Sequence, residues 1–302
     1  MTSGPKVREG LVLSSSRHYL TLIEPGGQSF EARVTSKDSA IIVGDRVRFV
    51  EQNGEYFVSE LLPRANIFSR SYREAERGIA ANVDRLFIVS AVLPLFNTVF
   101  IDRVMTVAFA QDIPFSLVLN KVDLGIEQTE PLLAVYERLG ITVDRISAKF
   151  EPTMPELVRE LRDQSLVVLC GVSGVGKSTI LNRLVPDAVR RISDVSSKTG
   201  QGKQTTSQSC GYPYITPAGQ QTVLVDLPGL QKFGVGHISK EQVAESFPEI
   251  VQHRTGCKFS DCAHIGEDDC QVKEAVRAAN MARFRYLSYV DMISEIESEK
   301  EY

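Results

Sequence analysis

The sequence lacks any long run of apolar residues, and no apolar core stands near its amino terminus. A membrane-spanning helix needs about 20 consecutive apolar residues, and a secretory signal needs an apolar core behind a basic start. We therefore expect no membrane span and no secretory leader, and a protein that works in the cytoplasm.

Cysteine is also scarce, with five residues in a chain of 302. An odd number in a chain of this length does not suit a framework of paired disulfides. The cysteine content therefore favours a reducing compartment, which agrees with a cytoplasmic location.

A surplus of charge is missing as well, because the formal net charge at pH 7 is only −4. Such a chain has no overall attraction to nucleic acid, so any affinity for RNA must come from local patches. The hydrophobic content of 43% is that of an ordinary globular protein, and the length allows two or three domains.

The clearest motif is a phosphate-binding loop, Gly171-Val172-Ser173-Gly174-Val175-Gly176-Lys177-Ser178. It follows an apolar run, residues 166–170, that predicts a buried strand, and it precedes a helix expected over residues 178–184. Glycines let backbone N–H groups surround phosphates at the start of such a helix. We expect Lys177 to contact the β- and γ-phosphates and the Ser178 hydroxyl to ligate Mg²⁺, and we include Thr179 among the nucleotide contacts.

A second motif, Asn120-Lys121-Val122-Asp123, tells which base is bound. It follows another apolar run, residues 115–119, at the kind of strand end where open α/β sheets bind ligands. The Asp123 carboxylate can accept hydrogen bonds from guanine N1–H and the guanine amine, whereas adenine would leave it unsatisfied. The Lys121 stem is expected to lie over the base, and Asn120 to tie this loop to the phosphate-binding loop. The triplet Ser147-Ala148-Lys149 is a second expected base contact.

The third motif, Asp226-Leu227-Pro228-Gly229, ends a strand expected over residues 222–225. We expect Asp226 to hold Mg²⁺ through water and the Gly229 N–H to approach the γ-phosphate. Residues 199–207 are rich in glycine and hydroxyl groups, which suits a switch whose threonine, Thr205 or Thr206, closes onto Mg²⁺. We assign this ligand to Thr206; a disordered surface loop is the alternative for the segment.

The order of these motifs differs from the common G-protein arrangement. There the phosphate-binding loop opens the domain and the guanine motif follows, whereas here both base-contacting motifs precede the phosphate-binding loop. The sequence therefore predicts a circularly permuted G domain. Its permutation joins the segment after Asp226-Leu227-Pro228-Gly229 directly to the carboxyl-terminal region through residues 233–249. Movement of this segment on hydrolysis is therefore expected to pull on that region.

Residues 10–62 predict a small all-β domain. Five short alternating runs are separated by turn signals at residues 25–27, 44–45 and 53–54, which indicates a closed barrel, OB-like or SH3-like. Such barrels often bind single-stranded nucleic acid, but acidic and basic residues are equally numerous over residues 1–67. The fold by itself does not establish that function.

The carboxyl-terminal region carries a metal-binding pattern, C-x₄-C-x-H-x₅-C, formed by Cys257, Cys262, His264 and Cys270. Three thiolates and an imidazole complete a closed tetrahedral site, which is typical of one structural zinc ion; buried free cysteines are the alternative. The other cysteines, Cys170 and Cys210, are expected to be small core residues. We expect a helix over residues 272–290 with a solvated basic face of Arg277, Arg283 and Arg285, and a solvated, frayed acidic tail over residues 295–301.

The barrel, the motif order NKVD, SAK, GVSGVGKS and DLPG, and the C-x₄-C-x-H-x₅-C pattern together resemble the RsgA family. These are circularly permuted GTPases that depend on the small ribosomal subunit. The resemblance implies GTP hydrolysis stimulated by that subunit, a role in its late maturation, and rRNA contacts by the barrel and the zinc domain. It also implies slow intrinsic turnover, in agreement with Leu230, which cannot orient water where Ras-like enzymes carry glutamine.

We expect a multidomain monomer with an OB-like β-barrel (1–67), a permuted α/β P-loop GTPase domain (68–245) and a helical zinc-binding domain (246–302). Its expected partners are GTP or GDP and the small ribosomal subunit with its rRNA. The chain departs from the family at Gln204, where members typically carry a histidine before their threonines, so the catalytic set is expected to be Gln204, Thr205, Thr206 and Lys177. The alternatives are a P-loop kinase or ATPase, which Asp123 disfavours, and a GTP-dependent RNA-binding switch with only slow hydrolysis.

Overall fold

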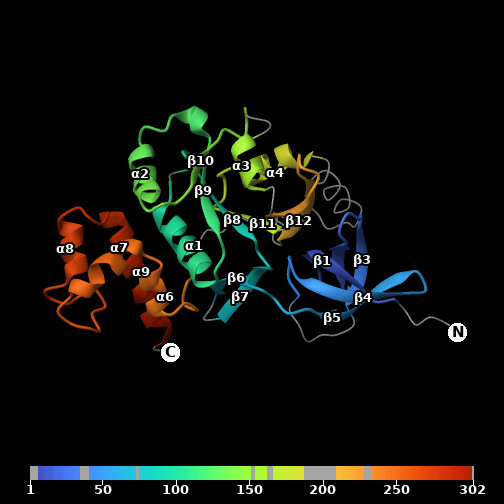
Figure 1. The fold of residues 1–302 in the computed structure, drawn as a ribbon, viewed down its shortest axis with the longest axis horizontal. Helices are drawn as coiled ribbons and strands as arrows, with labels where there is room; N and C mark the ends of the chain where they lie inside the picture. Colours follow the sequence, from blue (N-terminus) through green and yellow to red (C-terminus); the bar gives the residue numbers. More distant parts are fainter. Residues whose placement is uncertain are drawn as a thin grey trace.

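The structure is a computed structural model that describes residues 6–34, 41–72, 75–94, 96–150, 154–161, 166–186, 209–227 and 233–300. Three parts follow one another along its long axis, with a β-barrel at one end, a mixed sheet with helices in the middle and a group of helices at the other end (Figure 1). Among the helices of these residues, none combines the length and the apolar character that crossing a bilayer requires.

The amino-terminal part is a closed barrel of five strands in the order β1-β2-β3-β5-β4. The strands are β1 (Arg8–Ser15), β2 (Tyr19–Ile23), β3 (Ser29–Val34), β4 (Arg46–Gln52) and β5 (Glu55–Leu61). Neighbours are antiparallel except β3 and β5, which run parallel. The barrel interior is filled by alternate apolar side chains, including Val12, Leu22 and Phe49. This strand order is that of an OB-fold, so the OB-like prediction is confirmed.

A hairpin that the sequence analysis did not predict joins the barrel to the central sheet. It consists of β6 (Ile67–Tyr72) and β7 (Ala75–Ala81). The barrel backbone lies against its end, since the Ala81 N–H donates to the Val43 carbonyl at 2.9 Å. A Cβ at Gly44 would lie 2.0 Å from the Ala81 carbonyl oxygen, so only glycine permits this approach.

The central sheet contains six strands in the order β10-β9-β8-β11-β13-β12. They are β8 (Arg85–Ala91), β9 (Phe115–Asn120), β10 (Val143–Arg145), β11 (Leu166–Cys170), β12 (Cys210–Ile215) and β13 (Gln221–Asp226). All neighbours are parallel except β12 and β13. The chain fills one half of the sheet with β8 to β10 and then the other with β11 to β13, which confirms the predicted permutation.

Helices cover both faces of this sheet (Figure 1). One face packs against α1 (Thr98–Ala110) and α2 (Glu130–Arg138), and the other against α3 (Pro155–Glu160) and α4 (Lys177–Leu184). Strand β8 has apolar side chains on both faces. Leu86 and Ile88 belong to the core beneath α1 and α2, whereas Phe87 and Val89 belong to the core beneath α3 and α4. A strand buried on both sides needs apolar residues at successive positions, as residues 86–89 of β8 show.

The carboxyl-terminal helices are α6 (Lys240–Glu245), α7 (Pro248–His253), α8 (Gln271–Arg277) and α9 (Arg283–Lys300), with the 3₁₀ turn η2 (Arg254–Gly256) between α7 and α8. A second 3₁₀ turn, η1 (Val122–Leu124), follows β9 in the central part. Helix α9 packs against α1 and α6. The single helix expected over residues 272–290 is wrong. Residue Ala279 adopts a left-handed φ of 59°, and the N–H groups of Asn280 and Met281 both bond to the Ala275 carbonyl, which ends α8 before α9 begins.

The expected solvated basic face is also wrong at Arg285, although Arg277 and Arg283 are exposed as expected. Arg285 is 1% exposed and donates to Asp102 at 2.6 Å and to Glu249 at 3.1 Å. Its guanidinium lies 4.2 Å from the ring centre of Phe247. An arginine can occupy such a core because two carboxylates and an aromatic face replace its hydration.

The acidic tail is likewise more ordered than expected. Helix α9 continues to Lys300, and Glu295 accepts a hydrogen bond from the Val235 N–H at 2.7 Å. Arg103 of α1 donates to Glu295 at 2.5 Å and to the Phe233 carbonyl at 3.0 Å. The end of α9 is therefore fastened to the segment that follows Asp226-Leu227-Pro228-Gly229.

Candidate nucleotide site and metal centre

The phosphate-binding loop occupies residues 171–176, between the end of β11 and the start of α4. Its glycines are required by close approaches to neighbouring segments. A Cβ at Gly171 would lie 2.2 Å from the Val89 carbonyl oxygen, and one at Gly176 would lie 2.3 Å from the Asn120 side-chain nitrogen. Gly176 also has a φ of 98°, which L residues with a side chain rarely adopt.

Lys177 begins α4 and turns its amine back over the loop. Its Nζ donates to the Gly171 carbonyl at 2.8 Å and to the Val172 carbonyl at 3.2 Å, and the residue is 7% exposed. Burial lowers the Lys177 pKa, while nearby Asp226 raises it. The buried cation is therefore held at a helix N-terminus, where anionic phosphates are stabilised.

Asp226 and Ser178 form the oxygen-rich part of the site. The Ser178 hydroxyl donates to one carboxylate oxygen of Asp226 at 3.4 Å. The other oxygen, Oδ1, is buried and has no hydrogen-bond partner among the described residues. Burial raises the Asp226 pKa, and Lys177 and Ser178 lower it. A buried carboxylate oxygen beside a hydroxyl fits the ligand preferences of Mg²⁺.

Several expected site residues lie outside the described residues, which leaves their positions open. They are Gln204, Thr205, Thr206 and the rest of segment 199–207, together with Pro228, Gly229 and Leu230.

Asn120 connects the base-contacting loops to the phosphate-binding loop. Its side-chain amide nitrogen donates to the Val175 carbonyl at 2.9 Å. Its side-chain oxygen accepts from the N–H groups of Ala148 at 3.0 Å and Lys121 at 2.8 Å. One buried amide therefore holds together the ends of β9, β10 and β11.

Lys121 and Asp123 are both held in place. Lys121 has a left-handed φ of 63°, and its Nζ donates to the Gly174 carbonyl at 2.6 Å and the Leu93 carbonyl at 2.7 Å. The Ser147 hydroxyl donates to Asp123 Oδ1, which fixes the orientation of that carboxylate. The structure thus brings the described parts of all three motifs to the carboxyl edge of the sheet, where α/β folds bind ligands.

Two contacts of these loops were not predicted from the sequence. Leu93 supplies only a backbone carbonyl, which has no sequence signature. Arg183 on α4 donates to the carbonyl groups of Ala148 and Lys149; an exposed arginine at a helix end is normally solvated, so nothing in its spacing marks it out.

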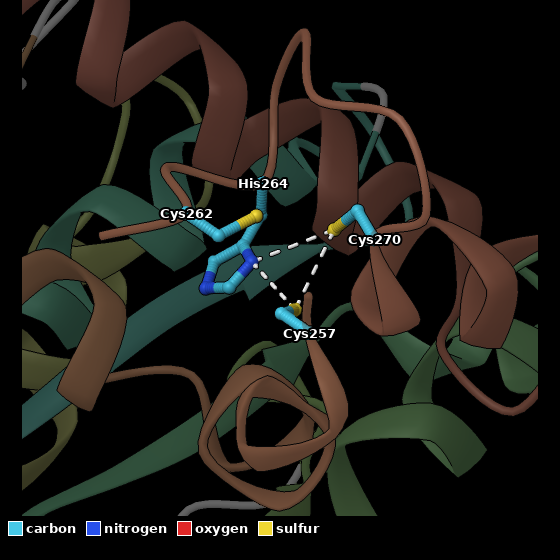
Figure 2. Close-up of side chains that lie close together, drawn as sticks. All are labelled: Cys257, Cys262, His264 and Cys270. Atoms are coloured by element: carbon cyan, nitrogen blue, oxygen red, sulfur yellow. Dashed lines mark hydrogen bonds between the residues drawn. The ribbon is translucent and has the colours of Figure 1, made fainter. Parts of the chain in front are cut away.

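The four predicted metal ligands converge from separate turns of the chain, as Figure 2 shows. The donor atoms of Cys257, Cys262, His264 and Cys270 all lie within 4.8 Å of one another. The His264 Nδ1 lies 3.5 Å from the sulfurs of Cys257 and Cys270, and these sulfurs are 3.9 Å apart. A tetrahedron with metal–sulfur bonds of about 2.3 Å and a metal–nitrogen bond of about 2.0–2.1 Å has edges of roughly 3.5–3.8 Å, so the cluster could hold a metal ion.

The surroundings of the cluster hold its ligands in position. Burial lowers the His264 pKa, which favours the neutral imidazole that a metal requires. The Tyr286 hydroxyl donates to the His264 carbonyl at 2.8 Å, and the Tyr289 hydroxyl donates to the Ala263 carbonyl at 2.9 Å. The carboxylate of Glu267 accepts from the N–H groups of Ala263 and Ile265. Helix α9 thus supports the loop that carries the four ligands, residues 257–270, which we call the metal loop.

Comparison with known proteins agrees with this architecture. The family model described as RsgA GTPase matches residues 61–236. A protein of Bordetella pertussis named small ribosomal subunit biogenesis GTPase RsgA is 34% identical, with 97% of this chain and 98% of that protein covered. The crystal structure of YjeQ from Thermotoga maritima has a TM-score of 0.73 at 28% identity, covering 96% of this chain and 99% of the other.

The crystal structure of YloQ, described as a circularly permuted GTPase, shares the fold at 23% identity, with a TM-score of 0.70. The matched region covers 97% of this chain and 96% of the YloQ chain. The likeness in fold extends over the barrel, the permuted sheet and the helical end. The matches to the family model and to the Bordetella pertussis protein show that the chain belongs to the RsgA GTPase family, and it is a GTP hydrolase.

Proposed function

We propose that this GTPase acts in the late maturation of the small ribosomal subunit, hydrolysing GTP to GDP and phosphate when that subunit stimulates it. The observation that carries the proposal is the meeting of Asp123, Lys177 and Asp226 at one edge of the sheet. The biological role is carried by the relatives, which are named for small-subunit biogenesis.

In the proposed site, Asp123 accepts hydrogen bonds from guanine N1–H and the guanine amine. The Ser147 hydroxyl donates to Asp123 Oδ1 and so holds this carboxylate in place. Lys177 leaves the loop carbonyls and binds the β- and γ-phosphates. Ser178, Asp226 and Thr206 would hold Mg²⁺, which would supply charge that neutralises the phosphates. Gln204 positions the attacking water by accepting one hydrogen bond and donating another. Thr205 and Gly229 complete the surroundings of the γ-phosphate.

We also propose that the metal of the Cys₃His cluster is one structural zinc ion. Four protein ligands leave no position for water, so the ion shapes the domain and performs no chemistry. The proposed domains are residues 1–67, 68–245 and 246–302. The outer two lie at opposite ends of the molecule (Figure 1), which suits simultaneous contacts with separate parts of the rRNA.

For its state in the cell, we propose a cytoplasmic monomer. Analytical ultracentrifugation of the purified protein, at concentrations above and below those in the cell, tests the monomeric state directly.

The decisive experiment measures GTP turnover with and without purified small ribosomal subunits. The proposal predicts slow turnover alone and strong stimulation by the subunit. Large subunits serve as the matched control, because they offer rRNA without the proposed target. Equal stimulation by both subunits would reduce the effect to unspecific RNA binding and contradict the proposal.

A second candidate is a GTP-dependent RNA-binding switch whose slow hydrolysis only times its release from RNA. Leu230 favours it, because leucine follows the glycine of the DxxG motif where Ras-like enzymes orient water with glutamine. This candidate predicts GTP-dependent binding to small subunits without any increase in turnover, so the same experiment separates the two.

A further inference from the structure

Arg183 belongs to none of the nucleotide-binding motifs, yet it contacts the base-contacting loop of residues 147–149. Its Nε donates to the Ala148 carbonyl at 3.2 Å, and its Nη2 donates to the Lys149 carbonyl at 2.7 Å. The residue is exposed at the end of α4. The guanidinium thus donates two hydrogen bonds to adjacent carbonyl groups, whereas a solvated arginine would donate to water instead.

Helix α4 thereby connects the two ends of the proposed nucleotide. It begins at Lys177 and Ser178, which serve the phosphates, and Arg183 lies in its last turn. The base loop is also held by Asn120, whose side-chain oxygen accepts from the Ala148 N–H. Arg183 and Asn120 together hold the N–H and carbonyl groups of Ala148 relative to the phosphate-binding loop.

The contact with Ala148 has a consequence for the next N–H group. The Ala148 carbonyl and the Lys149 N–H belong to one peptide, and in a trans peptide they point in opposite directions. A charged donor on the carbonyl therefore sets the direction of the Lys149 N–H and strengthens it as a donor. Guanine carries a carbonyl oxygen at C6 that needs such a donor, whereas adenine carries an amine there.

We propose that Arg183 is a positioning residue for guanine recognition, holding the peptide between Ala148 and Lys149 so that its N–H donates to guanine O6. Asp123 then recognises the N1 and C2 edge of the base, and the peptide fixed by Arg183 recognises C6. The inference rests on the proposed binding of guanine at this loop.

The test compares three diphosphates in equilibrium titrations of the full-length protein. GDP carries both the C6 oxygen and the C2 amine, IDP keeps only the oxygen, and 2-aminopurine riboside diphosphate keeps only the amine. Arg183→Ala should weaken GDP and IDP by about tenfold and the 2-aminopurine nucleotide by less than about twofold. Arg183→Lys, which keeps the charge but loses the guanidinium, should give an intermediate loss. In GTP turnover the effect should appear in KM and not in kcat.

Asn182→Ala is the matched control, because Asn182 is the exposed neighbour on the same helix. It should leave all three affinities unchanged. An equal loss for the three nucleotides in Arg183→Ala would indicate a purely structural role and overturn the inference, as would unchanged GDP affinity. A wild-type protein that binds ADP as well as GDP would overturn the guanine site itself, and with it the proposed function.

Discussion

Asp123 shows how a neighbouring side chain turns a common residue into a selective one. Because Ser147 donates to its Oδ1, an asparagine at this position would direct its oxygen to Ser147 and its amine toward the base. Asp123→Asn should therefore reduce GTP affinity by roughly 100-fold or more. Xanthosine nucleotides should gain affinity, because their C2 oxygen accepts where guanine donates. Fluorescence titration with both nucleotides checks this, and unchanged GTP affinity would remove Asp123 from the base site.

Gln204 gives a second prediction at the scale of a residue. A histidine in its place would titrate near about pH 6.5, whereas a neutral amide does not titrate. Subunit-stimulated hydrolysis should therefore be flat between about pH 6 and 8. Gln204→Ala should lower kcat and leave GTP affinity alone, the behaviour of a group that acts in the transition state. Wild-type stimulated rates in that variant would assign catalysis to Thr205 or Thr206 and the metal instead.

Arg285 lies in the core, so its loss is expected to affect the stability of the protein. Burial raises the Asp102 pKa and Arg285 lowers it, so removing the arginine leaves two buried carboxylates without a cation. Arg285→Met should destabilise the protein by about 3–5 kcal/mol in urea unfolding. Arg277→Ala is the control, because its pair with Glu274 is exposed and should contribute less than about 1 kcal/mol. Similar midpoints for the two variants would show that the buried network contributes little.

At the scale of elements, the metal loop and helix α9 should respond differently to chelation. The segment from Arg254 to Cys270 contains little regular structure apart from the short turn η2, so its order depends on the metal. Helix α9 is held independently, since Arg103 donates to Asp291 at 2.6 Å and Arg285 lies in the core. Chelation should therefore remove hydrogen-exchange protection from the loop and α8 while α9 stays protected.

Metal analysis and nucleotide binding complete that experiment. One equivalent of zinc should co-purify, and GDP affinity should remain within about twofold after chelation, because the cluster and the nucleotide site belong to separate elements. Freshly purified protein without zinc would contradict the assignment of the ion. Loss of protection throughout α9 would show that the metal, and not the contacts with α1, holds this helix.

At the scale of the whole molecule, α9 connects the segment that follows the DxxG motif to the metal loop. Glu295 accepts from the Val235 N–H and from Arg103, while the same helix supports the metal loop through Tyr286 and Tyr289. Glu295→Ala should lower subunit-stimulated turnover by about 3–10-fold, an ordinary size for a coupling between sites, and leave unstimulated turnover unchanged.

Glu297→Ala supplies the comparison, because Glu297 lies on the same helix but pairs with Lys240 of α6. Equal stimulation of wild type and Glu295→Ala would place the communication between subunit and nucleotide elsewhere. Equal losses in the two variants would instead indicate a general effect of charge on subunit binding.

The sequence by itself determined whatever is written in contiguous residues. The phosphate-binding loop, the guanine motif and the metal ligands each lie within a short stretch, because backbone curvature and ligand spacing are local properties. Alternation and turn residues likewise fixed the five barrel strands, and the order of the motifs fixed the permutation.

Only the tertiary structure decided which distant side chains meet. Arg285 and Arg183 both resemble solvated arginines in sequence, and one is buried between Asp102 and Glu249 while the other contacts the base loop. The break between α8 and α9 and the contact of Glu295 with Val235 were equally invisible. Such pairings depend on how helices pack against the sheet, and residues that meet across a packed core have no spacing in common along the chain.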